Sequence, residues 1–227
     1  MRGPPYAYII QTTMEDKKII IFDMDGVLFD SIGFAREFFI QRHPGVTKEM
    51  YNELHSGNLH AEAAKYSHLQ AKATEEEKLG YRAYYSEKKS RIPLFPGVKE
   101  LLINLHDAGH TLVLNTNAYD RNCLPLLENS GIRNLFDFIA SADVSKDKIE
   151  KFRAIQNKYG IGKDGILFVT DALGDVKDAG VVGIPTIAVT YGVHDKTFFE
   201  RETHLNLIGV VDTVNALTQL LNKILST

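Results

Sequence analysis

Four consecutive apolar residues followed by two aspartates constrain the fold of this chain more than any other feature. The apolar run Ile19–Phe22 predicts a buried strand, because a strand covered on both faces needs no alternation with polar residues. Asp23 and Asp25 follow at once, and side chains two residues apart on an extended backbone project to the same side. Two such carboxylates repel each other unless a cation or a shared proton compensates. Asp and Gly also form ordinary turns, so this stretch alone leaves a turn and a chemical site both open.

The composition is that of a globular chain with a small negative charge. Of its 227 residues, 44% are hydrophobic and 24% are charged, which suits one domain with an insertion or two small domains. A net charge of −3 gives no electrostatic case for a nucleic-acid or membrane partner. The single cysteine, Cys123, excludes an internal disulfide and fits a reducing, cytoplasmic setting. The apolar runs are far shorter than a membrane span.

The chain divides into three kinds of segment. Residues 1–16 are expected to be an N-terminal extension, since their short apolar patch is too small for a signal-peptide core. We further hypothesise that residues 1–13 lie outside the fold. Residues 31–91 have no strand-like run, and polar stretches of helical spacing over 60–73 and 74–89 predict a small cap of three or four helices.

The remaining segments, 17–30 and 92–227, alternate strand and helix patterns. This alternation predicts a Rossmann-like parallel sheet with right-handed crossovers and helices on both faces. Asp212 is expected to cap the final helix, and a short helix is expected to start near Asp175. After the first strand, the expected strands cover residues 111–115, 136–140, 166–169, 186–189 and 207–211.

Polar residues follow four of these strands. In an open parallel sheet, ligands bind beyond the carboxyl ends of the strands. Each position alone suits an ordinary role, such as a helix cap or a solvated lysine. Together they offer carboxylates for a hard divalent ion, one cation, and hydroxyl and amide groups, which is what phosphoryl transfer requires. The four are Asp23 with Asp25, Thr116 with Asn117, Lys146 in its loop, and Asp171 with Asp175.

The ordered motifs resemble those of the haloacid dehalogenase-like (HAD) phosphatase superfamily, in the subgroup with a helical cap after the first motif (phosphoglycolate phosphatase-like or β-phosphoglucomutase-like). The matching segments are residues 23–31, 112–117, 146–152 and 169–175. This family commonly has Lys-Pro in its third motif, whereas here Asp147 follows Lys146. Lys148 is therefore a rival, and Lys146 is favoured because Glu150 and Phe152 then fall in register. Thr170 stands where glycine is common in the family.

The resemblance implies a mechanism and a cofactor. Asp23 would be the nucleophile that forms an aspartyl-phosphate, and Asp25 would protonate the leaving oxygen and then activate water. Mg²⁺ would be held by Asp23, the backbone carbonyl of Asp25 and Asp171, with Asp175 supporting the metal directly or through a neighbour.

The resemblance also implies a phosphate-binding group, made of Thr116, Asn117 and Lys146. The acid at Asp25 favours phosphate esters over dehalogenation or phosphonate cleavage. A sugar-phosphate mutase and a catalytically silent binding or regulatory protein stay open as alternatives, and so does the choice between monomer and homodimer.

The cap is expected to select the substrate, a small phosphorylated metabolite. His55, Asn58 and His60 are candidate specificity residues, because they surround a helix break at Gly57. Solvated polar residues are the commoner case at such a break, and the histidine pair lacks the partners that a metal site needs. The tyrosines of the last cap helix, Tyr81, Tyr84 and Tyr85, are expected to pack the cap. The basic residues near its end, Lys88, Lys89 and Arg91, lie near the hinge; attraction of a second anionic group stays open for them, and surface charge is the default expectation.

Overall fold

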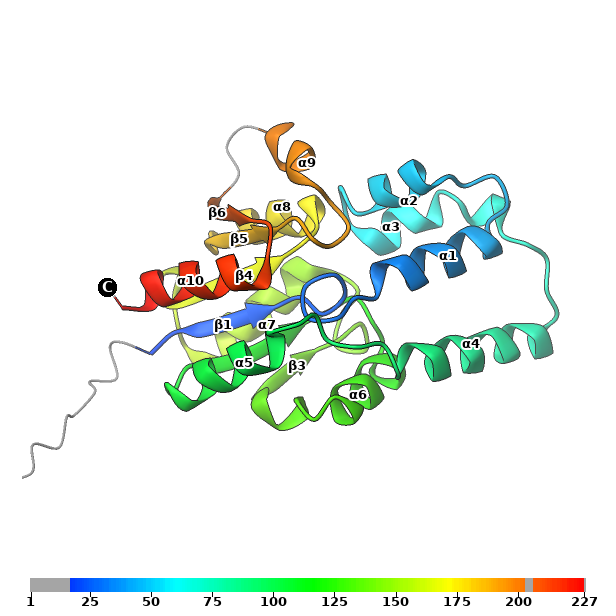
Figure 1. The fold of residues 1–227 in the computed structure, drawn as a ribbon. Coiled ribbons are helices and arrows are strands. Elements are labelled where there is room, and N and C mark those ends of the chain that lie inside the picture. Colours follow the sequence, from blue (N-terminus) through cyan, green and yellow to red (C-terminus); the bar gives the residue numbers. More distant parts are fainter. Residues whose placement is uncertain (1–16, 203–205, 227) are drawn as a thin grey trace, which may run out of the picture.

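The computed structural model describes residues 17–202 and 206–226, and within them six parallel strands form one sheet in the order β3-β2-β1-β4-β5-β6 (Figure 1). The expected extension, residues 1–16, lies outside the described residues. The predicted parallel α/β fold is confirmed. The strands are β1 (Ile19–Phe22), β2 (Thr111–Asn115), β3 (Phe138–Ala140), β4 (Ile166–Thr170), β5 (Thr186–Val189) and β6 (Leu207–Val211).

Strand β1 lies at the centre of the sheet and sends alternate side chains into two cores. Ile20 and Phe22 join the core that includes residues of α5, α6 and α10, whereas Ile19 and Ile21 join the core of α7 and α8. All four residues are almost fully buried, which explains why the strand is apolar at every position. The helices are α5 (Val98–Asp107), α6 (Asp120–Asn129), α7 (Lys148–Tyr159), α8 (Leu173–Val181) and α10 (Val214–Leu225).

The segment between β1 and α5 forms helices that lie beyond the carboxyl end of β1 (Figure 1). Thr47 caps the second of these helices, and Thr74 with Glu77 forms a capping box at the fourth. The expected helical pattern over 60–73 is wrong in its second half, where the chain turns so that Tyr66 packs against an apolar cluster. The elements are α1 (Ile32–Arg42), α2 (Lys48–Leu54), α3 (Leu59–Ala64), η2 (Ser67–Leu69) and α4 (Glu75–Lys89).

The two connections between the sheet and the inserted helices run side by side. Phe29 forms an isolated antiparallel bridge with Leu94. The backbone N–H of Phe95 donates to the carbonyl of Leu28 at 2.9 Å. These contacts lie two to four residues outside the expected cap boundaries of 31 and 91, and those boundaries stay a prediction.

Several helix boundaries differ from expectation. The final helix is capped by Thr213 rather than Asp212, because the Thr213 side chain accepts the free N–H of Ala216. Helix α8 begins at Leu173, two residues before the expected start. Short elements that were not anticipated are α9 (Lys196–Glu200), η3 (Arg133–Leu135) and η4 (Lys163–Gly165). In the part of the chain that the structure describes, none of the helices has the length and apolarity needed to cross a bilayer.

Candidate active site

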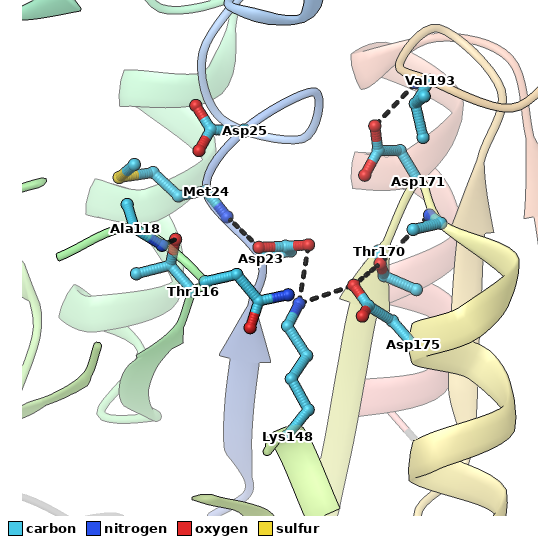
Figure 2. Close-up of polar contacts among 12 residues, drawn as sticks. Asp23, Met24, Asp25, Thr116, Ala118, Lys148, Thr170, Asp171, Asp175 and Val193 are labelled. Atoms are coloured by element: carbon cyan, nitrogen blue, oxygen red, sulfur yellow. Dashed lines mark hydrogen bonds and ion pairs between the residues drawn. The ribbon is translucent and has the colours of Figure 1, made fainter. Parts of the chain in front are cut away.

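Asp23 and Asp25 lie on the loop that leaves the carboxyl end of β1. The Asp23 carboxylate accepts a hydrogen bond from the backbone N–H of Met24 at 2.8 Å (Figure 2). Gly26 adopts a left-handed conformation with φ of 74°, and a Cβ there would lie 1.9 Å from the Asp171 carboxylate. Only glycine therefore allows this loop to pass so close to the end of β4.

Lys148 is the lysine that contacts the carboxylates. Its ammonium lies 2.8 Å from Asp23 Oδ2 and 2.5 Å from Asp175 Oδ2, and Figure 2 shows it extending from α7 between the two. Lys146 is exposed, and its backbone carbonyl accepts a bond from Asn58. The preference for Lys146 over Lys148 was wrong, because Asp147 caps α7 and places Lys148 at the first helical position, which faces the sheet.

Asp175 binds this lysine and also accepts a hydrogen bond from Thr170. The Thr170 hydroxyl donates to Asp175 Oδ2 at 2.9 Å (Figure 2). Thr170, which stands where the family commonly has glycine, therefore helps to position the Asp175 carboxylate. Burial alone would raise the pKa of Asp175, but the Lys148 ammonium and the hydrogen bonds of Asp175, including the one from Thr170, together hold the pKa below its ordinary value. The same ammonium opposes the effect of burial at Asp23, where the pKa still rises to about 7.

Asp171 is a buried carboxylate without an ion pair among the described residues. It accepts one hydrogen bond, from the backbone N–H of Val193 at 2.7 Å. Burial, and then the charge of Asp23, raises its pKa well above the ordinary value. Negative charge thus accumulates here in a way that a cation would relieve.

This charge distribution suits a hard cation. Among the residues that the structure describes, no group of three or more His, Cys, Asp or Glu side chains is arranged to hold a metal ion. Mg²⁺, however, is usually bound by one or two carboxylates and completes its shell with water and substrate phosphate. Asp23 and Asp171 meet that requirement, and Asp175, whose Oδ2 contacts Lys148 and Thr170, lies in the wall of the same cavity.

Asp25 is held by a buried lysine from the inserted helices. The Lys89 ammonium lies 2.8 Å from Asp25 Oδ2, and the Ser31 hydroxyl donates to Oδ1 at 2.5 Å. Burial alone raises the pKa of Asp25, but Lys89 and Ser31 together hold it below its ordinary value. The expectation that Lys89 is a surface charge was wrong: it is 2% exposed, because the last turn of α4 brings it back to the site.

A second buried lysine supports the end of β2. The Lys151 ammonium donates to the carbonyl of Thr116 at 2.6 Å and to Asn117 Oδ1 at 3.2 Å. The Thr116 hydroxyl accepts the N–H of Ala118 at 3.1 Å. Burial, and then the charge of Lys148, lowers the pKa of Lys151 to about 7. Sequence reasoning missed Lys151, although its place one helical turn after Lys148 was a usable signal.

A cavity of about 170 Å³ brings most of the expected site residues together. Of the cap candidates, His55 lines it, and burial lowers the pKa of this imidazole to about 4. Asn58 instead caps α3 and donates to the carbonyl of Lys146, so its side chain is already occupied. His60 lines a neighbouring cavity. The expected residues in the wall of the smaller cavity are Asp23, Asp25, Thr116, Asn117, Asp171, Asp175 and His55.

The loop after α2 packs tightly on the start of α8. The backbone N–H of Gly174 donates to the carbonyl of His55 at 2.8 Å, and a Cβ at Gly174 would lie 2.3 Å from the carbonyl oxygen of Gly57. His194, which follows β5, accepts from the N–H of Leu173 and lies 2.9 Å from the carbonyl of Asn52 through its other ring nitrogen. These contacts hold the inserted helices against the strand ends.

The parallel sheet and the lysine-bridged carboxylates beyond its strand ends define an α/β enzyme fold with helices inserted after the first strand. Residues 20–189 match the model of the haloacid dehalogenase-like hydrolases, and the chain belongs to this family. Over 195 residues it is 29% identical to a phosphoglycolate phosphatase of Aliivibrio fischeri, covering 78% of this chain and 86% of the relative. A phosphoglycolate phosphatase of Mesorhizobium japonicum is 26% identical, with 89% and 93% covered. The predicted superfamily and enzyme class are confirmed.

Solved structures agree on the fold. A Haemophilus somnus protein described as a predicted phosphoglycolate phosphatase superposes with a TM-score of 0.69 at 23% identity, covering 92% of this chain and 100% of its own. The L-2-haloacid dehalogenase of Xanthobacter autotrophicus superposes with a TM-score of 0.65 at 16% identity, covering 91% and 98%. Proteins named for different reactions thus share this fold, so the reaction has to be argued from the site.

Proposed function

We propose that this protein is a Mg²⁺-dependent phosphatase that hydrolyses a small phosphomonoester through a phosphorylated Asp23. The observation that carries the proposal is the Lys148 ammonium held between the buried carboxylates of Asp23 and Asp175, with a third buried carboxylate, Asp171, in the wall of the same cavity. Such a group supplies a nucleophile, a cation-binding pair and a fixed positive charge at one point. The names of the relatives make phosphoglycolate the first substrate to test.

In the first half of the reaction, an oxygen of Asp23 attacks the phosphorus atom and the bond to the ester oxygen breaks. The leaving oxygen takes a proton from Asp25, which produces the free alcohol. Lys148 reduces the repulsion between Asp23 and the approaching phosphate dianion, and Asp175 with Thr170 fixes the position of that lysine.

In the second half, water loses a proton to Asp25 as its oxygen attacks the phosphorus, and the Asp23 carboxylate is released with inorganic phosphate. The contacts of Asp25 with Lys89 and Ser31 stabilise the ionised carboxylate that this step needs. In the first half of the reaction, Asp25 can donate its proton only after its contact with Lys89 loosens.

Mg²⁺ bound at Asp23 and Asp171 would neutralise the negative charge on the phosphoryl oxygens. Thr116 and Asn117, supported by Lys151, would orient those oxygens.

The test is a panel of metabolite phosphomonoesters, phosphoglycolate included, assayed for phosphate release with Mg²⁺ and with EDTA. Asp23→Asn serves as the blank, and we expect its activity to fall by about 10³-fold or more. Phosphate release by Asp23→Asn at the wild-type rate would refute the assignment of Asp23 as the nucleophile. Turnover that requires a sugar bisphosphate activator would indicate a mutase instead, and inertness toward the whole panel would indicate a binding or regulatory protein.

A further inference from the structure

A second cavity, of about 550 Å³, lies in the inserted helices next to the carboxylate cavity. Its volume falls within the range of about 300–1,000 Å³ that is typical of ligand pockets. Tyr51, Leu59, Tyr85 and Asn122 line both cavities. A molecule with its phosphoryl group beside Asp23 therefore has room for its remaining part in the larger cavity.

Helices α1 and α4 supply much of the wall of this larger cavity, each from a single helical face. Phe38 and Phe39 of α1 and Tyr81 and Tyr85 of α4 lie in this wall, and the ring centroids of Phe38 and Tyr85 are 4.8 Å apart. The expected packing of the tyrosines is confirmed for Tyr85, which contacts Phe38, whereas Tyr81 and Tyr84 are 40% and 50% exposed; a ligand-sized space remains beside these rings. Such a wall favours a flat apolar group.

The charged side chains in this wall are all basic. Arg42, Lys78, Arg82 and Arg121 line the cavity, and the described residues of its wall include no Asp or Glu. The chain as a whole carries a net charge of −3, so such a concentration of cations is not a general property of its surface. Lys78 is paired with Glu75 at 2.7 Å, outside the wall. A ligand in this cavity would therefore meet a positive potential.

We propose that the substrate is a phosphomonoester whose leaving group carries an apolar ring and, at its far end, a second anionic group. This inference rests on the proposed phosphatase function. The ring would lie against Phe38 and Tyr85, and the anion would reach Arg82 and Arg121, whose guanidinium groups suit a carboxylate or phosphate. His60 Nε2 is buried in this wall without a hydrogen-bond partner among the described residues, and it offers one further polar contact.

Glycolate is too small to meet these requirements. It is a two-carbon acid without a ring, and its carboxylate would stay close to the phosphoryl group, within the 170 Å³ cavity. A bulkier leaving group can bury its ring against the aromatic wall and can also contact the basic side chains beyond it. The difference between the two kinds of substrate is therefore measurable.

The test compares three substrates with Mg²⁺: para-carboxybenzyl phosphate, para-(hydroxymethyl)benzyl phosphate and phosphoglycolate. The two benzyl esters have the same ring and the same type of leaving oxygen, so their ratio isolates the distant charge. We expect kcat/KM for the carboxybenzyl ester to exceed each of the others by about tenfold or more.

Variants then assign the preference to the basic wall. Arg82→Met and Arg121→Met keep much of the side-chain volume and remove the charge. We expect each to lower the carboxybenzyl-to-hydroxymethylbenzyl ratio by about tenfold. Arg153→Met, at an exposed arginine of α7 away from this wall, is the matched control and should keep the ratio.

A binding measurement separates this inference from the proposed hydrolysis. Para-carboxybenzylphosphonate has a P–C bond in place of the ester, so isothermal titration calorimetry measures its binding without turnover. Weaker binding to Arg82→Met and Arg121→Met than to wild type supports the inference even if no ester is hydrolysed. Asp23-dependent hydrolysis of phosphoglycolate without a preference for the carboxybenzyl ester, together with equal phosphonate binding by all variants, would overturn it.

Discussion

Replacing Lys148 with methionine is the most direct test of the site geometry. Methionine keeps the length of the apolar stem but removes the ammonium that lies within 2.8 Å of both Asp23 and Asp175. These two carboxylates are 8% and 6% exposed, so water cannot replace the lost charge. The variant therefore leaves buried negative charges uncompensated.

The expected loss of stability follows from this burial. Removing one partner of a buried ion pair costs about 3–5 kcal/mol, because the remaining charge is desolvated and unpaired. For a chain of this size, each kcal/mol lowers Tm by about 2–4 °C, so Lys148→Met should melt about 6–20 °C below wild type. Phosphate release should also fall, since the negative charge at Asp23 then repels the substrate phosphate.

The assay is thermal unfolding by circular dichroism in EDTA, with phosphate release measured separately in Mg²⁺. Lys146→Met is the control, because Lys146 is an exposed lysine two residues away, and we expect its free energy of unfolding to change by less than about 0.5 kcal/mol. Equal losses in the two variants, or none in Lys148→Met, would contradict the assignment of Lys148.

Two further predictions concern the cap contact and the buried thiol. Gly174→Ala places a Cβ 2.3 Å from the backbone of Gly57, so it should cost about 1–3 kcal/mol of stability in urea unfolding and slow turnover. Gly180→Ala, in the same helix with open space around it, should be neutral or stabilising, and the reverse order would disprove the close contact. Burial, and then the charge of Asp120, raises the pKa of Cys123 to about 12. Native protein at about pH 8 should therefore react with Ellman's reagent far more slowly than protein in guanidinium chloride, and rapid native labelling would show that the thiol is accessible.

The parallel sheet, and the sheet edge at which a site was expected, could be predicted from local sequence patterns. Buried parallel strands need apolar residues at nearly every position, and the run Ile19–Phe22 has them. Residues directly after such strands must meet at one edge of the sheet, so Asp23, Thr116 and Asp171 could be grouped although they lie far apart in the sequence. These are consequences of local periodicity and of one topological rule.

Which basic residues contact the carboxylates could not be predicted without the packed fold. Lys146 and Lys148 are two positions apart, and their roles depend on where α7 begins, which the Asp147 cap determines. Lys89 resembles any lysine in a charged helix end until the fold returns α4 to Asp25, 64 residues earlier in the chain. The basic and aromatic wall of the larger cavity likewise forms only when α1, α4 and α6 pack together. The sequence does not show which way each charged side chain points, because that depends on how the helices are oriented in the fold.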